Sequence, residues 1–262
     1  MSSGAEVEVI ICADSAEVGE VAAEKIAGIC RKAVTPVLGL ATGSSPLALY
    51  AGLARRVNEG TLDLSHAVGF ALDEYVGIDT SHPQSYAQVI NTYVTVPLRM
   101  DPSRVHVPDG NAEDLYAAAA AYDLMIEESG GVDAQVLGIG TNGHIGFNEP
   151  TSSFSSRTRP KTLTPQTRED NRRFFADDEK VPLHCVTQGL GTIMEARELV
   201  LVASGEHKAD AIAACVEGPV SAMCPASILQ FHESATVIID EAAASKLRLI
   251  DYYTYVARNQ PM

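Results

Sequence analysis

The sequence predicts an α/β protein built on a parallel sheet. Short apolar runs rich in β-branched residues alternate along the chain with longer helical patterns, which is typical of βα units. The chain has 262 residues, a length typical of one large domain or two small ones. Because 46% of its residues are hydrophobic, the chain can form a sizeable core.

The elements of the first half follow from these runs. VEVIIC, PVLGLA and AVGFAL are short and apolar, as buried strands are, and Pro46 suits the first turn of a helix. We predict, in order, a strand at Val7–Cys12, a helix at Ala16–Lys32, a strand at Pro36–Ala41, a helix at Pro46–Asn58, a strand at Ala67–Leu72 and a helix near Ser85–Val96.

The second half repeats the alternation. An alanine-rich stretch at residues 112–128 is predicted as a helix, with Tyr116, Leu124 and Ile126 as core candidates. The elements expected after it are strands at Ala134–Gly140, Glu198–Ser204 and Ala235–Asp240, and helices at Glu206–Val216 and Glu241–Leu249.

Residues 151–182 interrupt the pattern. The segment is rich in Ser, Thr, Arg, Asp and Pro and has no sustained apolar period. A stretch of this length inside a compact α/β domain is commonly a functional loop. We predict an active-site lid.

The formal net charge of −15 excludes several kinds of partner. Duplex nucleic acid and anionic membrane surfaces are both bound through clustered Lys and Arg. We find neither a signal peptide at the opening MSSGAEVE nor an apolar run long enough to span a membrane, and expect a cytoplasmic protein. The five cysteines, which form no CxxC pair, are predicted to be reduced thiols in or near the core: Cys12, Cys30, Cys185, Cys215 and Cys224.

The first candidate site follows the strand predicted at Pro36–Ala41. Thr42, Gly43, Ser44 and Ser45 stand between that strand and a helix, where small residues expose backbone N–H groups and the helix N-terminus favours an anion. The segment could bind a phosphate or be an ordinary βα turn with a serine cap. It lacks the pattern of a nucleoside-triphosphate loop.

Two further segments place acid–base groups after predicted strands. Asp73 and Glu74 follow the strand at Ala67–Leu72, where a carboxylate could act as a general base or simply cap a turn. LGIGTNGHIGFNEP gathers Asn142, His144 and Glu149 between glycines. His144 can move protons near neutral pH, with Asn142 or Glu149 orienting its ring.

An anionic substrate of so acidic a protein needs local positive charge in its pocket. Arg173, in the predicted lid, and Lys208, in the SGEHKA turn, are the candidates, although each could be an ordinary surface cation. The remaining histidines show no metal-binding spacing, so no metal is implied.

Together these segments resemble the glucosamine-6-phosphate deaminase (isomerase) family. LGLATGSSP, LDEYVGI, LGIGTNGHIGFNEP, SRTRPKTLT and SGEHKA carry the resemblance over nearly the whole chain. It implies a single domain over residues 1–262, a three-layer αβα sandwich with a Rossmann-like parallel sheet, similar to ribose-5-phosphate isomerases and CoA transferases. It also implies conversion of glucosamine 6-phosphate and water to fructose 6-phosphate and ammonia.

The resemblance implies roles for the candidate residues. Asp73 corresponds to the base that moves a proton from C2 to C1, and His144 to the group that assists ring opening, supported by Glu149 and Asn142. Thr42 to Ser45, Arg173 and Lys208 correspond to the phosphate clamp, and no cofactor or metal is required. Some members carry aspartate at position 142, so we expect Glu149 to carry more of the support for His144 here.

Regulation and specificity stay open. Ser152, Arg159 and Lys161 correspond to the N-acetylglucosamine 6-phosphate site of allosteric hexameric members, whereas Tyr252, Tyr253 and Tyr255 cannot be assigned because Thr254 interrupts the tyrosines. A hexamer and a monomer are both compatible with the sequence. The alternatives are a galactosamine-6-phosphate isomerase and a 6-phosphogluconolactonase-like hydrolase, the second of which would not need Asp73. A sugar-phosphate sensor that regulates transcription would need a DNA-binding segment, and it is disfavoured because the first predicted strand begins near Val7 and the net charge is strongly negative.

Overall fold

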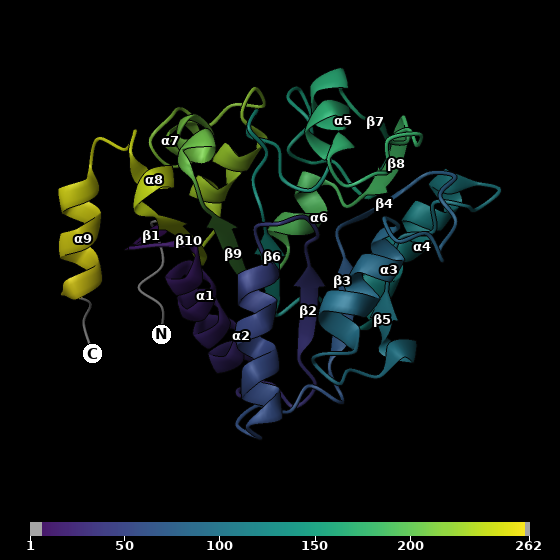
Figure 1. Ribbon diagram of the computed structural model, residues 1–262, viewed down its shortest axis with the longest axis horizontal. Helices are drawn as coiled ribbons and strands as arrows, with labels where there is room; N and C mark the ends of the chain where they lie inside the picture. Colours follow the sequence, from purple (N-terminus) through teal and green to yellow (C-terminus); the bar gives the residue numbers. More distant parts are fainter. Residues whose placement is uncertain (1–6, 260–262) are drawn as a thin grey trace.

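A seven-stranded, fully parallel sheet forms the centre of the molecule (Figure 1). The computed structural model describes residues 7–259. The spatial order of the strands is β1-β10-β9-β6-β2-β3-β5. Their bounds are β1 Glu8–Cys12, β2 Val37–Leu40, β3 Val68–Ala71, β5 Val105–His106, β6 Ala134–Leu137, β9 Glu198–Ala203 and β10 Ala235–Asp240.

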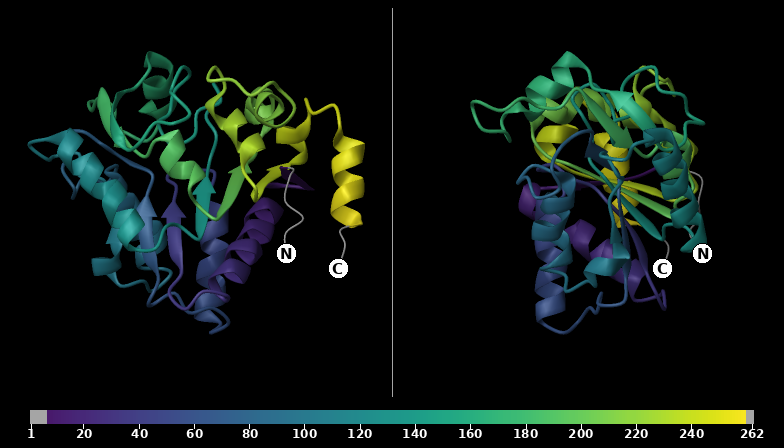
Figure 2. Two further views of the ribbon diagram at one scale, coloured as in Figure 1. Left: turned by 180° about the vertical axis from the view of Figure 1, so that it is seen from behind. Right: turned by 90° about the vertical axis from the view of Figure 1, so that its right-hand side faces the viewer.

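Helices cover both faces of this sheet, which makes three layers. α1, α2 and α3 lie on one face, and α4 and α6 lie on the other (Figures 1 and 2). Side chains of Asp14, Ser85, Asp114 and Thr164 cap α1, α3, α4 and α5. The helices are α1 Ser15–Cys30, α2 Leu47–Asn58, α3 Tyr86–Ile90, α4 Leu115–Glu128, α5 Pro165–Arg172, α6 Leu190–Met194, α7 Ala209–Val216, α8 Glu241–Ala244 and α9 Ile250–Arg258, with a π turn at Asn91–Thr95 and 3₁₀ turns at Pro102–Arg104, Glu206–Lys208 and Pro225–Phe231.

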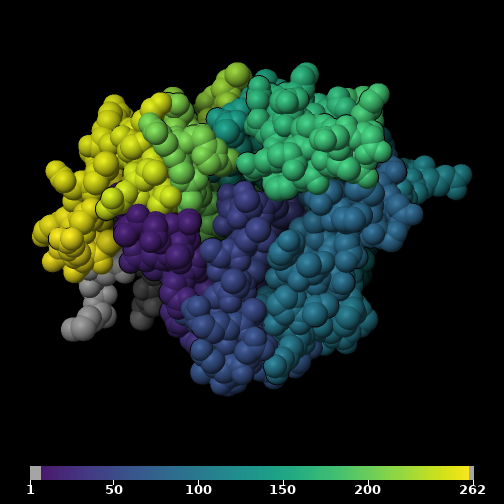
Figure 3. Space-filling model, in the orientation of Figure 1, coloured from purple at the N-terminus to yellow at the C-terminus, as the bar shows by residue number. Residues whose placement is uncertain are grey.

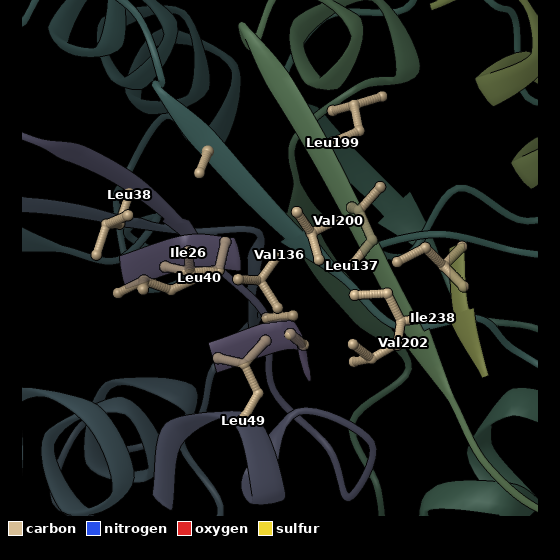
Figure 4. Packing of buried hydrophobic residues seen from close by; sticks show 14 of the residues in the cluster. Ile26, Leu38, Leu40, Leu49, Val136, Leu137, Leu199, Val200, Val202 and Ile238 are labelled. Carbon is tan, nitrogen blue, oxygen red and sulfur yellow. The ribbon is translucent and has the colours of Figure 1, made fainter. Parts of the chain in front are cut away.

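The core lies between the sheet and these helices. Every residue of β2, β3, β6 and β10 is buried, as expected for strands covered on both faces. Figure 4 shows strand residues such as Val136 and Val202 packed beside Ile26 of α1 and Leu49 of α2. This apolar contact fixes the strand ends from which the site is built.

A second, smaller sheet stands beyond the carboxyl ends of the central strands. It has the order β4-β8-β7 and is antiparallel, with β4 at Asp73–Tyr75, β7 at Arg159–Thr162 and β8 at His184–Thr187. Its own apolar cluster includes Tyr75, Phe147 and Phe175. This cluster joins the strand that carries Asp73 to the segment predicted as a lid.

The structure confirms the parallel α/β architecture and corrects several details. Residues 151–182 are not a loop, because they contain β7 and α5, whose polar sequences conceal their regularity. Tyr116 and Leu124 are wrong as core residues, since they are 73% and 52% exposed, whereas Ile126 is buried. The last predicted helix ends early, at Ala244, and the separate helix α9 follows it.

The cysteine prediction is confirmed for the described part of the chain. All five thiols are free, and only Cys224 is more than slightly exposed. Among residues 7–259 there is no helix with the length and apolar character to cross a membrane.

Candidate active site

The loops after β2, β3 and β6 lie at the same end of the central sheet (Figure 1). A pocket of about 610 Å³ is lined by residues of these loops. β2 and β6 are neighbours in the sheet, but the chain continues from them toward opposite edges. Such a switch point leaves a crevice outside the carboxyl ends of the strands, where ligands of open α/β sheets bind. The residues that line the pocket include Thr42, Gly43, Ser44, Ser45, Asp73, His144, Arg173 and Lys208.

The loop after β2 has the geometry of an anion site. Buried Tyr50 fixes its start, since the hydroxyl bonds both the N–H and the C=O of Ala41 at 3.0 and 2.9 Å. Gly43 has a φ of +87°, which glycine tolerates readily. No side chain caps the first turn of α2, so the serine-capping alternative does not apply and N–H groups there stay available to a ligand.

Two cations reach this loop from distant parts of the sequence. Arg173, which caps the C-terminus of α5, lies with Nη2 3.5 Å from Ser44 Oγ. Lys208 donates from Nζ to Ile139 O at 2.7 Å, and burial, followed by the nearby charge of Arg173, lowers its pKa. Both positive charges therefore stand at the same end of the pocket.

Asp73 is buried on β4, at the floor of the pocket. It is 4% exposed and pairs in register with Thr187 of β8, whose hydroxyl bonds its carboxylate. Burial, together with the charge of Glu74, raises the pKa of Asp73 well above its usual range. A carboxylate that holds a proton more firmly than usual is suited to take one from carbon and return it.

Asn142 links His144 to Glu149 at the opposite wall of the pocket. A carboxylate only accepts hydrogen bonds, so the Asn142 amino group faces Glu149 Oε2, at 2.7 Å. The Asn142 oxygen then faces the ring and accepts from Nδ1 of His144, also at 2.7 Å. Since Nδ1 holds the proton of the neutral ring, Nε2 is left free to accept another.

Glu149 supports the ring mostly through this amide. Its Oε2 lies 3.6 Å from His144 Nδ1, farther than the Asn142 oxygen, so the support expected from Glu149 is relayed rather than direct. Burial raises the pKa of Glu149, but its interactions with His144, Thr167 and Asn142 outweigh burial and lower the pKa to about 2. The carboxylate is therefore charged at neutral pH.

The sequence did not indicate several residues that line or support the pocket. Tyr75 and Tyr86 line the pocket with hydroxyls 3.2 Å apart, and Asn171 of α5 donates to Tyr75 Oη at 3.0 Å. Asp170, also on α5, accepts from Thr141 Oγ1 at 3.2 Å. The only available signal was the position of the tyrosines next to Asp73 and within a predicted helix, because their convergence depends on the second sheet.

Ser152, Arg159 and Lys161 do not line the pocket. Ser152 is buried, and its Oγ has no hydrogen-bond partner among residues 7–259. Arg159 and Lys161 alternate on β7, and Figure 1 places α9, with its tyrosines, on the other side of the molecule. Within residues 7–259, no group of three or more His, Cys, Asp or Glu side chains is arranged to hold a metal ion.

Comparison with known proteins gives consistent results. The family described as glucosamine-6-phosphate isomerases/6-phosphogluconolactonase matches residues 13–238. A glucosamine-6-phosphate deaminase of Cutibacterium acnes is 59% identical over 248 residues, which cover 95% of this chain and 95% of the relative. A solved monomeric glucosamine-6-phosphate deaminase has a TM-score of 0.89 and 39% identity, and the match covers 92% of this chain and 100% of that one.

A more distant structure shares the fold alone. The 6-phosphogluconolactonase from Trypanosoma cruzi has a TM-score of 0.75 at 18% identity, with 94% of this chain and 98% of that chain covered. The same layered architecture therefore occurs with a very different sequence, and the chemistry has to be argued from the residues of the pocket.

Proposed function

The chain belongs to the glucosamine-6-phosphate isomerase/6-phosphogluconolactonase family, and we infer that it converts glucosamine 6-phosphate and water to fructose 6-phosphate and ammonia. The observation that carries this inference is the pocket itself, which combines two cations at an anion-binding loop with a buried carboxylate and an oriented imidazole. These are the groups that an isomerisation of a sugar phosphate requires.

We propose that the phosphate binds to Thr42–Ser45, Arg173 and Lys208. Free N–H groups of the loop and first turn of α2 would donate to the phosphate oxygens, and the guanidinium and ammonium groups would balance their charge. This end of the pocket would fix the sugar so that C1 and C2 lie between Asp73 and His144.

The chemical steps then follow from the two proton-transfer groups. His144 Nε2 would take the proton of the anomeric hydroxyl and pass it to the ring oxygen, opening the ring. Asp73 would take the proton from C2, whose electron pair forms the C1–C2 double bond of an enolamine while the C1 carbonyl oxygen takes a proton from the substrate's ammonium group. Asp73 would then return its proton to C1, as the nitrogen lone pair forms the C2 iminium. Water then adds to the C2 iminium carbon, and the C–N bond breaks to release ammonia.

Ammonia release from glucosamine 6-phosphate tests this proposal, with Asp73→Asn as the control. We expect the unaltered protein to release ammonia and the variant to lose at least 100-fold in kcat, the low end of general-base effects. Release only from the galactosamine epimer would instead assign a galactosamine-6-phosphate isomerase. Hydrolysis of 6-phosphogluconolactone that survives Asp73→Asn would assign a lactonase.

We also propose that Ser152, Arg159 and Lys161 form a site for an anionic effector, N-acetylglucosamine 6-phosphate. The two cations share one face of β7 by their alternation, and the hydroxyl of Ser152 lacks a partner. Activation of the enzyme by this sugar phosphate would support the proposed site. Hyperbolic kinetics that do not change when the sugar phosphate is added would rule the site out.

We further propose that the enzyme works in the cytoplasm, since its thiols are free. Sedimentation analysis would distinguish a hexamer from a monomer. For comparison, the solved relative described above is a monomeric enzyme.

A further inference from the structure

Asp73 and Glu74 are two adjacent carboxylates that are both buried. Asp73 is 4% exposed and Glu74 is 3% exposed. As neighbours on β4 they point to opposite sides of the strand, Asp73 toward the pocket and Glu74 toward α3. No ion pair to either carboxylate occurs within residues 7–259, so two adjacent carboxylates are buried without a cation paired to either of them there.

Their hydrogen bonds differ in a way that separates their roles. Glu74 accepts three backbone N–H groups: Tyr75 at 2.8 Å and Tyr86 at 2.9 Å on Oε1, and Ala87 at 2.9 Å on Oε2. For Asp73, the described part of the chain supplies one hydrogen-bond partner, the hydroxyl of Thr187. Burial raises the pKa of both carboxyls, but three fixed donors offset part of this rise at Glu74, whereas Asp73 has fewer contacts to hold it ionised and its pKa is raised well above its usual range. When two titratable groups have such different environments, the proton is exchanged by the less stabilised one.

The bonds to Glu74 also anchor the start of α3. Tyr86 and Ala87 are the first two residues of this five-residue helix, and Tyr86 carries a pocket hydroxyl. The Glu74 carboxylate therefore fixes β4, the strand that carries Asp73, relative to α3.

We propose that Glu74 is a positioning residue for the reaction: its carboxylate, fixed by three backbone N–H groups, places a negative charge behind Asp73 and secures α3 over the pocket. The inference rests on the proposed function, in which Asp73 takes a proton from C2 and later releases it to C1. A neighbouring negative charge makes Asp73 a better proton acceptor.

Other groups around Asp73 leave Glu74 as the main charged neighbour. The titratable side chains that face Asp73 from the elements packed against it are Tyr75 on β4, Tyr86 on α3, Tyr122 on α4, Cys185 on β8 and, across the pocket, His144. Burial raises the pKa of the tyrosines and of Cys185, so these four groups are neutral near pH 7. A substitution of Glu74 therefore removes the main charge next to Asp73.

The pH dependence of kcat/KM tests the proposal. In Glu74→Gln the acid limb should move to lower pH by about one unit, because Asp73 without its charged neighbour stays ionised in more acidic solution. Glu74→Asp keeps the charge, so its limb should stay near that of the unaltered protein. Since the substrate is the same throughout, its own titration cancels in the comparison.

Ser85→Ala is the matched control for a merely structural effect. Ser85 caps α3 by accepting from Gln88 N at 3.1 Å, so its loss loosens the same helix without changing a charge. Its acid limb should not move. A Glu74→Gln limb that also stays in place, while activity falls as in Ser85→Ala, would overturn the proposal.

A titration of the unaltered protein covers the case in which Glu74→Gln does not fold. The ¹³C carboxyl signals of Asp73 and Glu74 should shift together as pH falls, because protonation of one changes the pKa of the other. Two independent titrations at ordinary pKa values would reject the coupling. If the unaltered protein released no ammonia, the proposed function would fail, and this titration would still decide whether Glu74 acts on Asp73.

Discussion

The imidazole of His144 lies directly against the backbone of Gly140. A Cβ added at Gly140 would come within 2.2 Å of His144 Cε1, and Gly140 N donates to His144 O at 2.9 Å. Gly140→Ala should therefore push the ring away from Asn142 and lower kcat by about tenfold or more, the contribution typical of an oriented acid–base group. Steady-state kinetics of ammonia release would measure this loss.

Gly28→Ala is the matched control for Gly140→Ala. Nothing lies within 4 Å of a Cβ added at Gly28, which is inside α1, so the variant should keep full activity and gain some helix stability. If Gly140→Ala were as active as Gly28→Ala, the ring could relax freely, and its orientation by Asn142 would not matter.

Glu149 should make stability depend on pH. Its pKa of about 2 lies below the ordinary value of 4.5, so the charged form stabilises the fold above pH 4.5, and that stabilisation is lost as pH falls toward 2. At ~1.4 kcal/mol per pKa unit, the shift from 4.5 to about 2 contributes at most about 3.5 kcal/mol. Urea unfolding from pH 6 to pH 2 should therefore be less pH-dependent in Glu149→Gln than in the unaltered protein.

Turnover of Glu149→Gln should fall by roughly tenfold or more, because a neutral amide holds Asn142 and the imidazole less firmly. Identical pH dependence of unfolding in the two proteins would contradict the ionised state of Glu149. Near-normal turnover of Glu149→Gln would show that Glu149 does not support His144.

At the scale of elements, the sequence predicts the buried strands well and the second sheet poorly. β2, β3, β6, β9 and β10 are mostly apolar, and such runs have few alternatives to a covered strand. β4 and β7 are short, and β7 has the sequence RPKT, so they become strands only because β8 pairs with both. Tertiary pairing of this kind leaves no local pattern to detect.

The candidate site also has one part that the sequence predicts and another that it does not. Loops at the ends of predicted strands are found from sequence, because parallel strands end at one edge of the sheet. Tyr75 and Asn171 are 96 positions apart and meet only through the second sheet, so no spacing could indicate their contact.

The contact between Asn171 and Tyr75 predicts how α5 is held over the pocket. Figure 3 shows the segment that contains α5, in green, lying above the blue part of the chain that follows β2. Asn171→Ala removes a hydrogen bond worth about 1 kcal/mol, so KM should rise about fivefold as α5 is released more often. Amide hydrogen exchange within α5 should become faster, while that of β9 stays unchanged.

Glu169→Ala is the control on the same helix. Glu169 is exposed and accepts no hydrogen bond from the described part of the chain. Its KM and exchange rates should match those of the unaltered protein. An Asn171→Ala variant with unchanged exchange in α5 would show that other contacts hold the helix.

For the whole molecule, the net charge of −15 determines where a phosphate can bind. The global field opposes an anion, so under the proposed function affinity would depend on Arg173, Lys208 and the N–H groups of the loop after β2, which converge at one end of the pocket. Arg173→Gln and Lys208→Gln should each raise KM about tenfold or more, the range of a hydrogen bond to a charged group. Kinetics with glucosamine 6-phosphate would measure both.

Lys32→Gln distinguishes this local clamp from the global field, because it removes the same unit of charge at an exposed position in the turn after α1, away from the pocket. A clamp predicts that Lys32→Gln changes KM by less than about twofold. It also predicts that the KM ratio of each pocket variant to the unaltered protein falls as salt rises from about 0.05 to 0.5 M, since salt screens the attraction that the variant has lost. If all three variants raised KM equally, the net charge alone would govern binding. A KM ratio near one for Arg173→Gln and Lys208→Gln would mean that neither cation contacts the phosphate.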